Sequence, residues 1–284
     1  MFDQSSHLLR VTAFVGAALV PVAASAAPVD IQVVFSTTEN ETLTTSQQAI
    51  FTQAEAYWEA ALTGYNPLIT NAPAAVVIQA SAPLIDGVNG VLGSAGPTFV
   101  SIGGGFAVTT AGVMQFDSVD IDALETNGTL FDVIQHEMAH VLGFGTLWNL
   151  EADLGAEFAG TQAVYVRGSG EYTGTAALAA YNAEFDPLAT FVPVDIVSGP
   201  GTADGHWDEN WAGGRNDLMT GFLDAPTFVS DTTLASFIDI GYLVDLTVND
   251  ALAPVPVPPG ILLGLSGLGL MGFVGRRRRK VRAA

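Results

Sequence analysis

Residues 129–145, TLFDVIQHEMAHVLGFG, decide how this chain folds. Five apolar residues recur on one side of the segment at helical spacing: Leu130, Val133, Ile134, Met138 and Val141. Such a stripe predicts a helix that packs against a core. Thr129 and Asp132 have the Thr-x-x-Asp spacing of a capping box, which places the start of this helix. Gly143 predicts its end, because glycine readily adopts the left-handed conformation that terminates many helices.

The same segment carries the residues that point to chemistry, His136, Glu137 and His140. Histidines at i and i+4 project from one face of a helix, about 6 Å apart, so both imidazoles can reach one metal ion. Glu137 is rotated by one residue and can approach a water held by that metal. It would then act as general base and later pass the proton to a leaving amine.

Histidine and cysteine counts narrow the choice of a third ligand. The chain has 4 His and no Cys, which removes disulfides, thiol catalysis and any metal site built on sulfur. A catalytic zinc needs three protein ligands and one open position. Besides His7 near the N-terminus, only His206 remains, in the segment DGHWD at 204–208. The alternative is that His206 is an ordinary histidine in a surface loop.

The spacing of the third ligand separates the known zinc peptidase families. A thermolysin-like site has a glutamate ligand about twenty residues after the second histidine. Glu151 and Glu157 follow His140 at shorter spacing, and neither lies in a clear helical pattern. The metzincin pattern has glycine three residues after that histidine and a third histidine three residues later. Gly143 fits, but Thr146 occupies the histidine position. A metzincin therefore requires an insertion that carries the ligand downstream.

That departure is typical of the leishmanolysin family, which this sequence resembles over roughly residues 110–245. HEMAHVLGFG at 136–145 resembles its zinc helix, GHWD at 205–208 its late third-ligand segment, and NDLMTG at 216–221 its Met-turn. The resemblance implies that zinc is bound by three residues: His136, His140 and His206. It implies that Glu137 is the general base and that Met219 lies beneath the metal. A plain core methionine at 219 is compatible with that role.

The resemblance also implies the fold class, an α+β, metzincin-like zincin. We expect a twisted mixed sheet with the zinc helix, followed by an irregular C-terminal subdomain with the Met-turn and a final helix. Eukaryotic members are disulfide-rich and kept latent by a propeptide cysteine. A chain without cysteine cannot use such a switch.

Hydrophobic patterning gives the remaining elements. We expect strands near 29–36, 74–80, 98–102 and 113–116, where apolar or β-branched runs are separated by turn residues. Ser46 can cap a helix that continues to about Leu62, and a last helix is expected from Thr232 to Ile240. Between the zinc helix and about Gly221 the chain reads as loops.

Charge excludes one class of partner. Between residues 27 and 275 only Arg167 and Arg215 are basic, against 28 acids, so nucleic acid is repelled. Three acids before the zinc helix, Asp117, Asp120 and Asp122, offer oxygen ligands for calcium at close spacing. The run lacks the twelve-residue calcium-loop pattern, and a solvated turn is the alternative.

The two ends are interpreted as sorting signals. Residues 1–26 have the apolar run and the Ala24-Ser25-Ala26 motif of a secretory signal peptide. Residues 254–284 are Pro-rich, then apolar, then basic, a plan that resembles the PEP-CTERM signal. That resemblance implies transient anchoring in the inner membrane and processing by an exosortase. An ordinary C-terminal anchor is the alternative.

These patterns divide the chain into 1–26, a catalytic subdomain 27–145, a subdomain 146–253 with His206 and Met219, and the tail 254–284. The function they predict is an exported zinc endopeptidase that cleaves polypeptides with a zinc-bound water activated by Glu137. The alternative is a non-catalytic extracellular matrix or surface protein in which the metal site only stabilises the fold.

Overall fold

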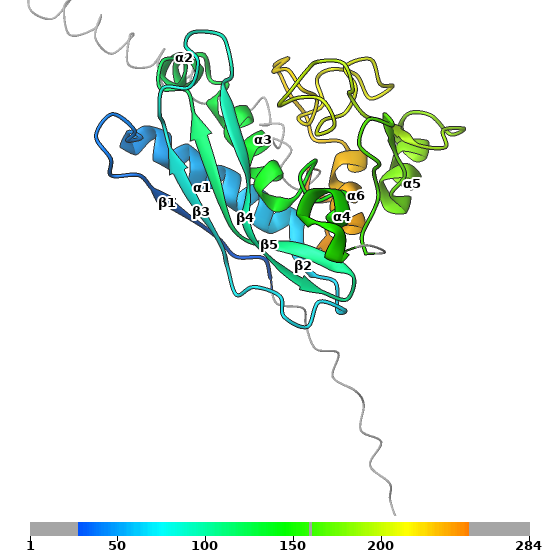
Figure 1. Ribbon diagram of the computed structural model, residues 1–284. Helices are drawn as coiled ribbons and strands as arrows, with labels where there is room; N and C mark the ends of the chain where they lie inside the picture. The colour runs from blue at the N-terminus through cyan, green and yellow to red at the C-terminus, as the bar shows by residue number, and fades with distance from the viewer. Residues whose placement is uncertain (1–27, 159–160, 250–284) are drawn as a thin grey trace, which may run out of the picture.

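The computed structural model describes residues 28–158 and 161–249 (Figure 1). Its centre is a four-stranded sheet in the order β1 (Ile31–Phe35), β3 (Val76–Ser81), β5 (Phe106–Phe116) and β4 (Gly93–Gly103). The first three strands are parallel, and β4 runs antiparallel to β5 at the edge. The hairpin between β4 and β5 turns at Gly104 and Gly105, both at positive φ. The mixed sheet confirms the expected α+β class.

Two long helices, α1 (Thr45–Ala61) and α3 (Leu130–Leu142), cover one face of the sheet (Figure 1). They are joined by a hydrogen bond from the Trp58 indole to the carbonyl oxygen of Gln135. The capping residue of α1 is Thr44, not Ser46, because Thr44 and Gln47 form a reciprocal capping box.

Helix α3 follows its sequence pattern, except at its start. All five residues of the apolar stripe are buried, and Gly143 ends the helix in the left-handed conformation. The predicted capping box is wrong, because Thr129 has near-helical dihedral angles and its side chain makes no capping hydrogen bond. Asp132 instead accepts a hydrogen bond from Thr227, far along the chain. Asp132 therefore does not cap the helix and instead lines the cleft described below.

The C-terminal half is more ordered than its sequence indicates. It contains α4 (Leu150–Leu154), a 3-10 turn (Ala156–Phe158), α5 (Thr175–Glu184) and α6 (Asp231–Asp239). Two small antiparallel sheets pair β2 (Leu62–Tyr65) with β8 (Tyr242–Val244), and β6 (Glu171–Tyr172) with β7 (Val192–Pro193). The final helix is confirmed, whereas α5 was missed. Its buried side chains, Ala177 and Tyr181, are too few to set a clear apolar stripe.

A short helix, α2 (Ile121–Asn127), occupies the region between β5 and α3. It was not expected, because the acid-rich segment before it reads as a turn. Gly128 ends it in the left-handed conformation and lets the chain begin α3 almost at once.

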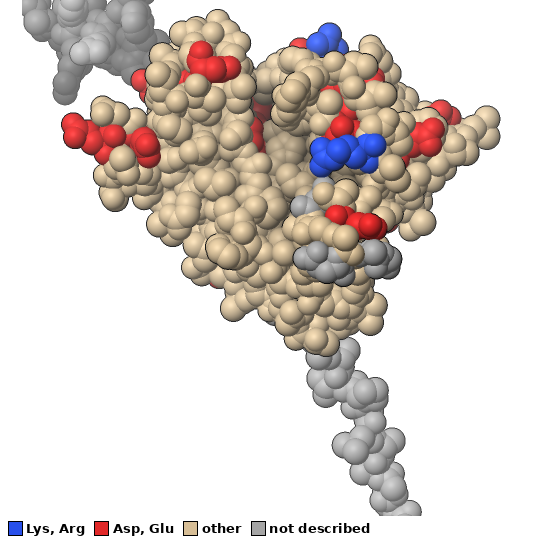
Figure 2. Space-filling view, viewed as in Figure 1, with Lys and Arg blue, Asp and Glu red and all other residues tan. Residues whose placement is uncertain are grey.

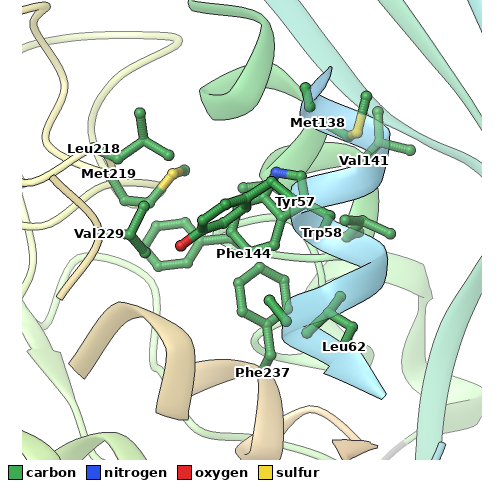
Figure 3. Close-up of a cluster of buried hydrophobic side chains, with 14 of the residues drawn as sticks. Tyr57, Trp58, Leu62, Met138, Val141, Phe144, Leu218, Met219, Val229 and Phe237 are labelled. Atoms are coloured by element: carbon green, nitrogen blue, oxygen red, sulfur yellow. The ribbon is translucent and has the colours of Figure 1, made fainter. Parts of the chain in front are cut away.

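An apolar core joins the two halves (Figure 3). Trp58 of α1, Met138 and Val141 of α3, and Phe237 of α6 are fully buried in it, together with Met219 from the segment before α6. Gly112 of β5 permits this packing, because a Cβ there would overlap the Val141 side chain. Since α3 is packed on both the sheet and the C-terminal half, it is held firmly where it carries the histidines.

The sorting signals proposed for residues 1–26 and 254–284 lie outside the described residues. Among the helices of 28–158 and 161–249, none combines the length and apolar character needed to cross a bilayer.

Candidate metal centre

Three histidine side chains converge at the surface of α3. The Nε2 atoms of His136, His140 and His206 lie 3.0 Å (136–140), 3.1 Å (136–206) and 2.9 Å (140–206) apart. They form a nearly equilateral triangle with its centre roughly 1.7 Å from each corner, close enough together for all three to bind one metal ion.

The other ring nitrogen of each histidine fixes its tautomer. The Nδ1–H groups of His136, His140 and His206 donate to backbone carbonyl oxygens of Leu218 (2.6 Å), Phe144 (2.9 Å) and Thr202 (2.7 Å) respectively. A carbonyl only accepts, so Nδ1 carries the proton and Nε2 keeps its lone pair. Three lone pairs facing one point repel each other unless a cation lies between them. The donor set therefore fits a metal such as zinc.

Burial keeps these rings neutral, as metal ligands must be. Desolvation, helped by the neighbouring His206, lowers the pKa of His136 to about 3. Desolvation also lowers the pKa of His140 far below its ordinary value and lowers that of His206. Protons therefore compete weakly for these nitrogens at neutral pH.

Glu137 lines the cleft beside the histidines, and the residue is only 6% exposed. Burial raises the pKa of this carboxyl to about 8. The residue facing it across the cleft wall is Gly93, at the start of β4. A Cβ at Gly93 would lie 2.8 Å from Oε1 and 2.9 Å from Cγ of Glu137. The absence of a side chain at 93 therefore makes room for the glutamate. Gly93 was not among the candidate site residues expected from the sequence.

The third histidine arrives on a segment fixed by aromatic packing. Trp207, next to His206, is fully buried and stacks between Trp148 and Trp211. Its indole donates to the Thr233 hydroxyl of α6 at 2.8 Å. Gly145 allows the close approach, since a Cβ there would overlap the backbone of Gly205. The packing of Trp207 and the close approach at Gly145 therefore position the backbone that carries His206.

The segment around Met219 connects the ligands. Besides the Leu218 carbonyl at His136, the Met219 carbonyl accepts the Trp207 N–H at 3.0 Å. Buried Asp217 accepts from the Met219 N–H at 2.8 Å and from the Thr233 hydroxyl at 2.9 Å. Met219 itself is fully buried in the apolar core (Figure 3). Sequence reasoning missed Asp217 as the residue that organises this segment.

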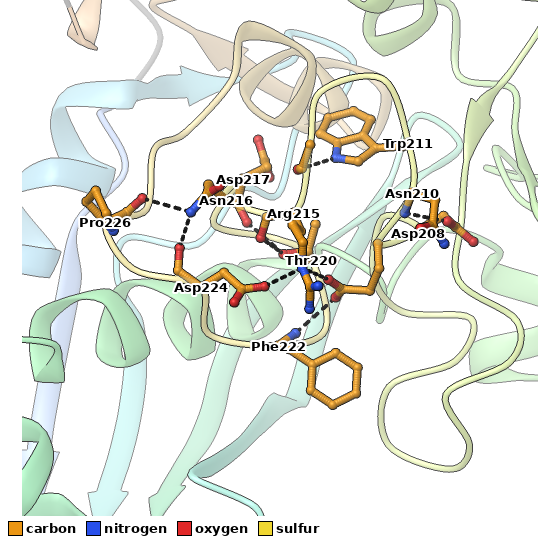
Figure 4. Close-up of polar contacts among 12 residues, drawn as sticks. Asp208, Asn210, Trp211, Arg215, Asn216, Asp217, Thr220, Phe222, Asp224 and Pro226 are labelled. Atoms are coloured by element: carbon orange, nitrogen blue, oxygen red, sulfur yellow. Dashed lines mark hydrogen bonds and ion pairs between the residues drawn. The ribbon is translucent and has the colours of Figure 1, made fainter.

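The loop from 208 to 226 forms one wall of the site and is braced by its own polar contacts (Figure 4). The Arg215 guanidinium lies 2.6 Å from Asp224 and 3.6 Å from Glu209. The Phe222 N–H donates to Glu209 at 3.2 Å. These contacts hold the wall in place without any ligand.

A cleft of about 620 Å³ opens over the histidines. Its lining comes from residues 90–95 leading into β4, from α3, from 145–146, 200–206 and 218–227, and from Arg167. Figure 2 shows the molecule hollowed between the half with the sheet and the C-terminal half, with acidic atoms visible inside. Thr146, the residue at the ordinary metzincin ligand position, lines this cleft but donates its hydroxyl to the His140 carbonyl at 2.7 Å.

The three acids proposed for calcium have other partners. Asp117 accepts backbone N–H groups of residues 85, 86 and 87 on one oxygen and of Val119 on the other. These bonds, that of Gly87 first, hold its pKa at about 2. Asp120 accepts from the Asn89 N–H, and Asp122 accepts from the Gln47 amide. The structure therefore does not support a calcium site here; Asp117 instead anchors the segment that leads into the cleft wall.

The comparisons agree with this geometry. A family model described as leishmanolysin matches residues 89–253, which is more than half of the chain. No curated protein matches it. The matched range includes the three histidines, Glu137 and the segment around Met219. The chain belongs to the leishmanolysin family of metallopeptidases.

Proposed function

We propose that this protein is a zinc-dependent endopeptidase in which His136, His140 and His206 hold the metal. The observation that carries the proposal is the convergence of three unprotonated Nε2 atoms with a buried carboxylate beside them. A zinc ion bound there supplies a Lewis acid for the scissile carbonyl and makes water a better nucleophile at neutral pH.

Glu137 is the residue that moves protons. Its carboxylate takes a proton from the water that attacks the scissile carbonyl and then delivers it to the departing amine. Its burial beside the histidines places the carboxylate where it can accept that proton and release it again. A purely structural metal site has no use for such a group.

Edge strand β4 provides a place for an extended substrate. It pairs with β5 on one side only, and its residues Gly93, Ser94 and Ala95 line the cleft. A polypeptide that runs along this edge can add backbone hydrogen bonds as a further strand. We therefore infer that the substrate is a polypeptide bound in an extended conformation.

Met219 forms the apolar floor of the site in this proposal, as the Met-turn of a metzincin-like fold. Its support is the pair of carbonyls at 218 and 219, which hold His136 and the Trp207 backbone. The side chain itself contributes packing and no ligand atom.

Three proteins test the function: the wild type, Glu137→Gln and His206→Ala. We expect one zinc per chain and casein cleavage for the wild type. Glu137→Gln should keep its zinc while the rate falls by about 10²–10⁴-fold. His206→Ala should lose both zinc and activity. Zinc in the wild type without cleavage of any peptide would favour the alternative, a non-catalytic protein with a structural metal site. Turnover by Glu137→Gln at the wild-type rate would refute the role of the glutamate.

We also propose that the protein is exported, that residues 1–26 are removed, and that an exosortase processes the tail 254–284 after transient anchoring. The support is the sequence of both ends. Mass spectrometry of the mature protein tests it, and a chain that starts at Met1 would contradict the signal peptide.

A further inference from the structure

Asp204 has a backbone conformation that residues with a side chain seldom adopt. Its φ is +67°, in the left-handed region, where a Cβ crowds the following carbonyl oxygen. The other two residues of 195–206 with positive φ, Gly199 and Gly201, have no Cβ. Glycine at 204 would adopt the same conformation at lower cost, so the side chain of the aspartate contributes something that glycine cannot.

The Asp204 carboxylate ties its segment to a fixed part of the core. Its Oδ1 atom accepts hydrogen bonds from the Tyr165 hydroxyl and, at 2.6 Å, from the Gly168 N–H. Tyr165 is buried and its ring packs edge-on against Trp148. Its carbonyl oxygen accepts from the Asn149 amide at 2.9 Å. None of these contacts involves a histidine, so the anchor exists before a metal binds.

Asp204 also lies between the two points that orient the His206 imidazole. Its N–H donates to the Asp195 carbonyl oxygen at 2.7 Å. The Asp195 N–H donates to the His206 carbonyl oxygen at 2.9 Å, which closes residues 195–206 into a loop. Inside this loop the His206 Nδ1–H donates to the Thr202 carbonyl oxygen at 2.7 Å. A change in the dihedral angles of Asp204 therefore displaces the backbone that carries the ring relative to the carbonyl that orients it.

We propose that Asp204 is a positioning residue for the third metal ligand. Through Tyr165 and Gly168 it holds the 202–206 turn, which keeps the His206 Nε2 at 2.9 and 3.1 Å from the Nε2 atoms of the other two histidines. Asp204 does not bind the ion itself, since the described residues that could hold one ion together are the three histidines alone. The inference rests on the metal site of the proposed function.

The first test measures the zinc Kd of three Asp204 variants by competition with a chelator. Asp204→Gly keeps the backbone conformation but removes the acceptor, and Asp204→Ala loses both, so the Kd should rise by about 10–100-fold in each. Asp204→Asn removes the charge but keeps Oδ1 as an acceptor, and asparagine tolerates positive φ, so it should bind zinc as tightly as the wild type. An equal loss in Asp204→Asn and Asp204→Gly would overturn the inference, because the charge and not these hydrogen bonds would then be responsible.

Tyr165→Phe keeps the inference testable if a variant at 204 fails to fold. It removes one of the two donors to Asp204 without changing the backbone at 204. The zinc Kd should rise by about tenfold. A Tyr165→Phe protein with the wild-type Kd would contradict the anchoring of the His206 turn.

The second readout is the visible absorption spectrum of the protein loaded with Co²⁺, whose bands report the geometry of the ligands. At saturating cobalt, Asp204→Gly should differ from the wild type because His206 is displaced, whereas Asp204→Asn should show the wild-type bands. A merely structural role would lower the unfolding temperature of the metal-free protein without changing the bands.

Two outcomes separate this inference from the proposed function. Wild-type bands and wild-type zinc affinity in Asp204→Gly would overturn the role of Asp204 and leave the peptidase standing. A wild type that binds no zinc would refute the metal site, and with it both the proposed function and this inference.

Discussion

Replacing Gly93 by alanine tests how closely β4 approaches Glu137. The new Cβ would lie 2.8 Å from Oε1, 2.9 Å from Cγ and 3.0 Å from Cδ of Glu137, whereas ordinary van der Waals contacts begin at 3.4 Å. The glutamate must therefore shift by roughly half an ångström or turn away from the metal. Displacements approaching 1 Å in a catalytic group can cost on the order of 10²-fold. We expect kcat to fall by about 10–100-fold.

The three atoms nearest to a Cβ at Gly93 all belong to Glu137 and none to a histidine, so zinc content should remain one per chain. Gly96→Ala is the matched control on the same strand, because a Cβ there meets only Thr146 Cγ2 at 3.9 Å. The assay is kcat on a fluorogenic peptide, with zinc measured in each protein. If Gly93→Ala turned over as fast as Gly96→Ala while folded and zinc-loaded, the close approach of β4 to Glu137 would not govern catalysis.

Two further substitutions address the residues that organise the site. Asp117→Asn should lower the midpoint of thermal unfolding near pH 6. Hydrogen bonds depress the pKa of the Asp117 carboxyl from 3.8 to about 2, so its contribution to the stability of the fold is present above pH 4 and is lost as the pH falls to 2. The gap between the two proteins should therefore close across that range, and a gap independent of pH would contradict the assignment. Asp217→Ala leaves the Met219 and Ser230 N–H groups and the Thr233 hydroxyl without their acceptor, so we expect a loss of about 3 kcal/mol in the free energy of unfolding, measured by urea denaturation. A loss below about 1 kcal/mol would mean that water replaces the carboxylate.

The site is largely assembled before any ligand binds. Each imidazole is oriented by a carbonyl, and the third-ligand segment is held by the stacked indoles around Trp207. Metal affinity depends on such outer contacts nearly as much as on the ligands. A substitution at Trp207 would therefore weaken zinc binding without removing a ligand atom.

The sequence by itself determined the zinc helix, because its two periodic signals are local. Apolar spacing fixes the buried side of α3, and the i, i+4 histidines are brought together by the helix alone. The end of the helix at Gly143 and the positions of the main strands follow from equally short patterns, whereas their parallel or antiparallel pairing does not. The assignment of His206 came from counting histidines and from the resemblance, since nothing local marks a residue 66 positions after His140 as its neighbour.

Tertiary structure decided the contacts between distant segments. The spacing of Thr129 and Asp132 predicted a cap, but packing turned Asp132 toward Thr227 and the cleft. Gly93 lies opposite Glu137 only because β4 folds back beside β5 at the edge of the sheet nearest α3. From the sequence, Asp117 was either a calcium ligand or part of a solvated turn. In the folded chain its carboxylate accepts hydrogen bonds from four backbone N–H groups. Short-range patterns encode which residues share a helix face, whereas the partner of a polar side chain is set by whichever segment the fold brings within hydrogen-bonding distance.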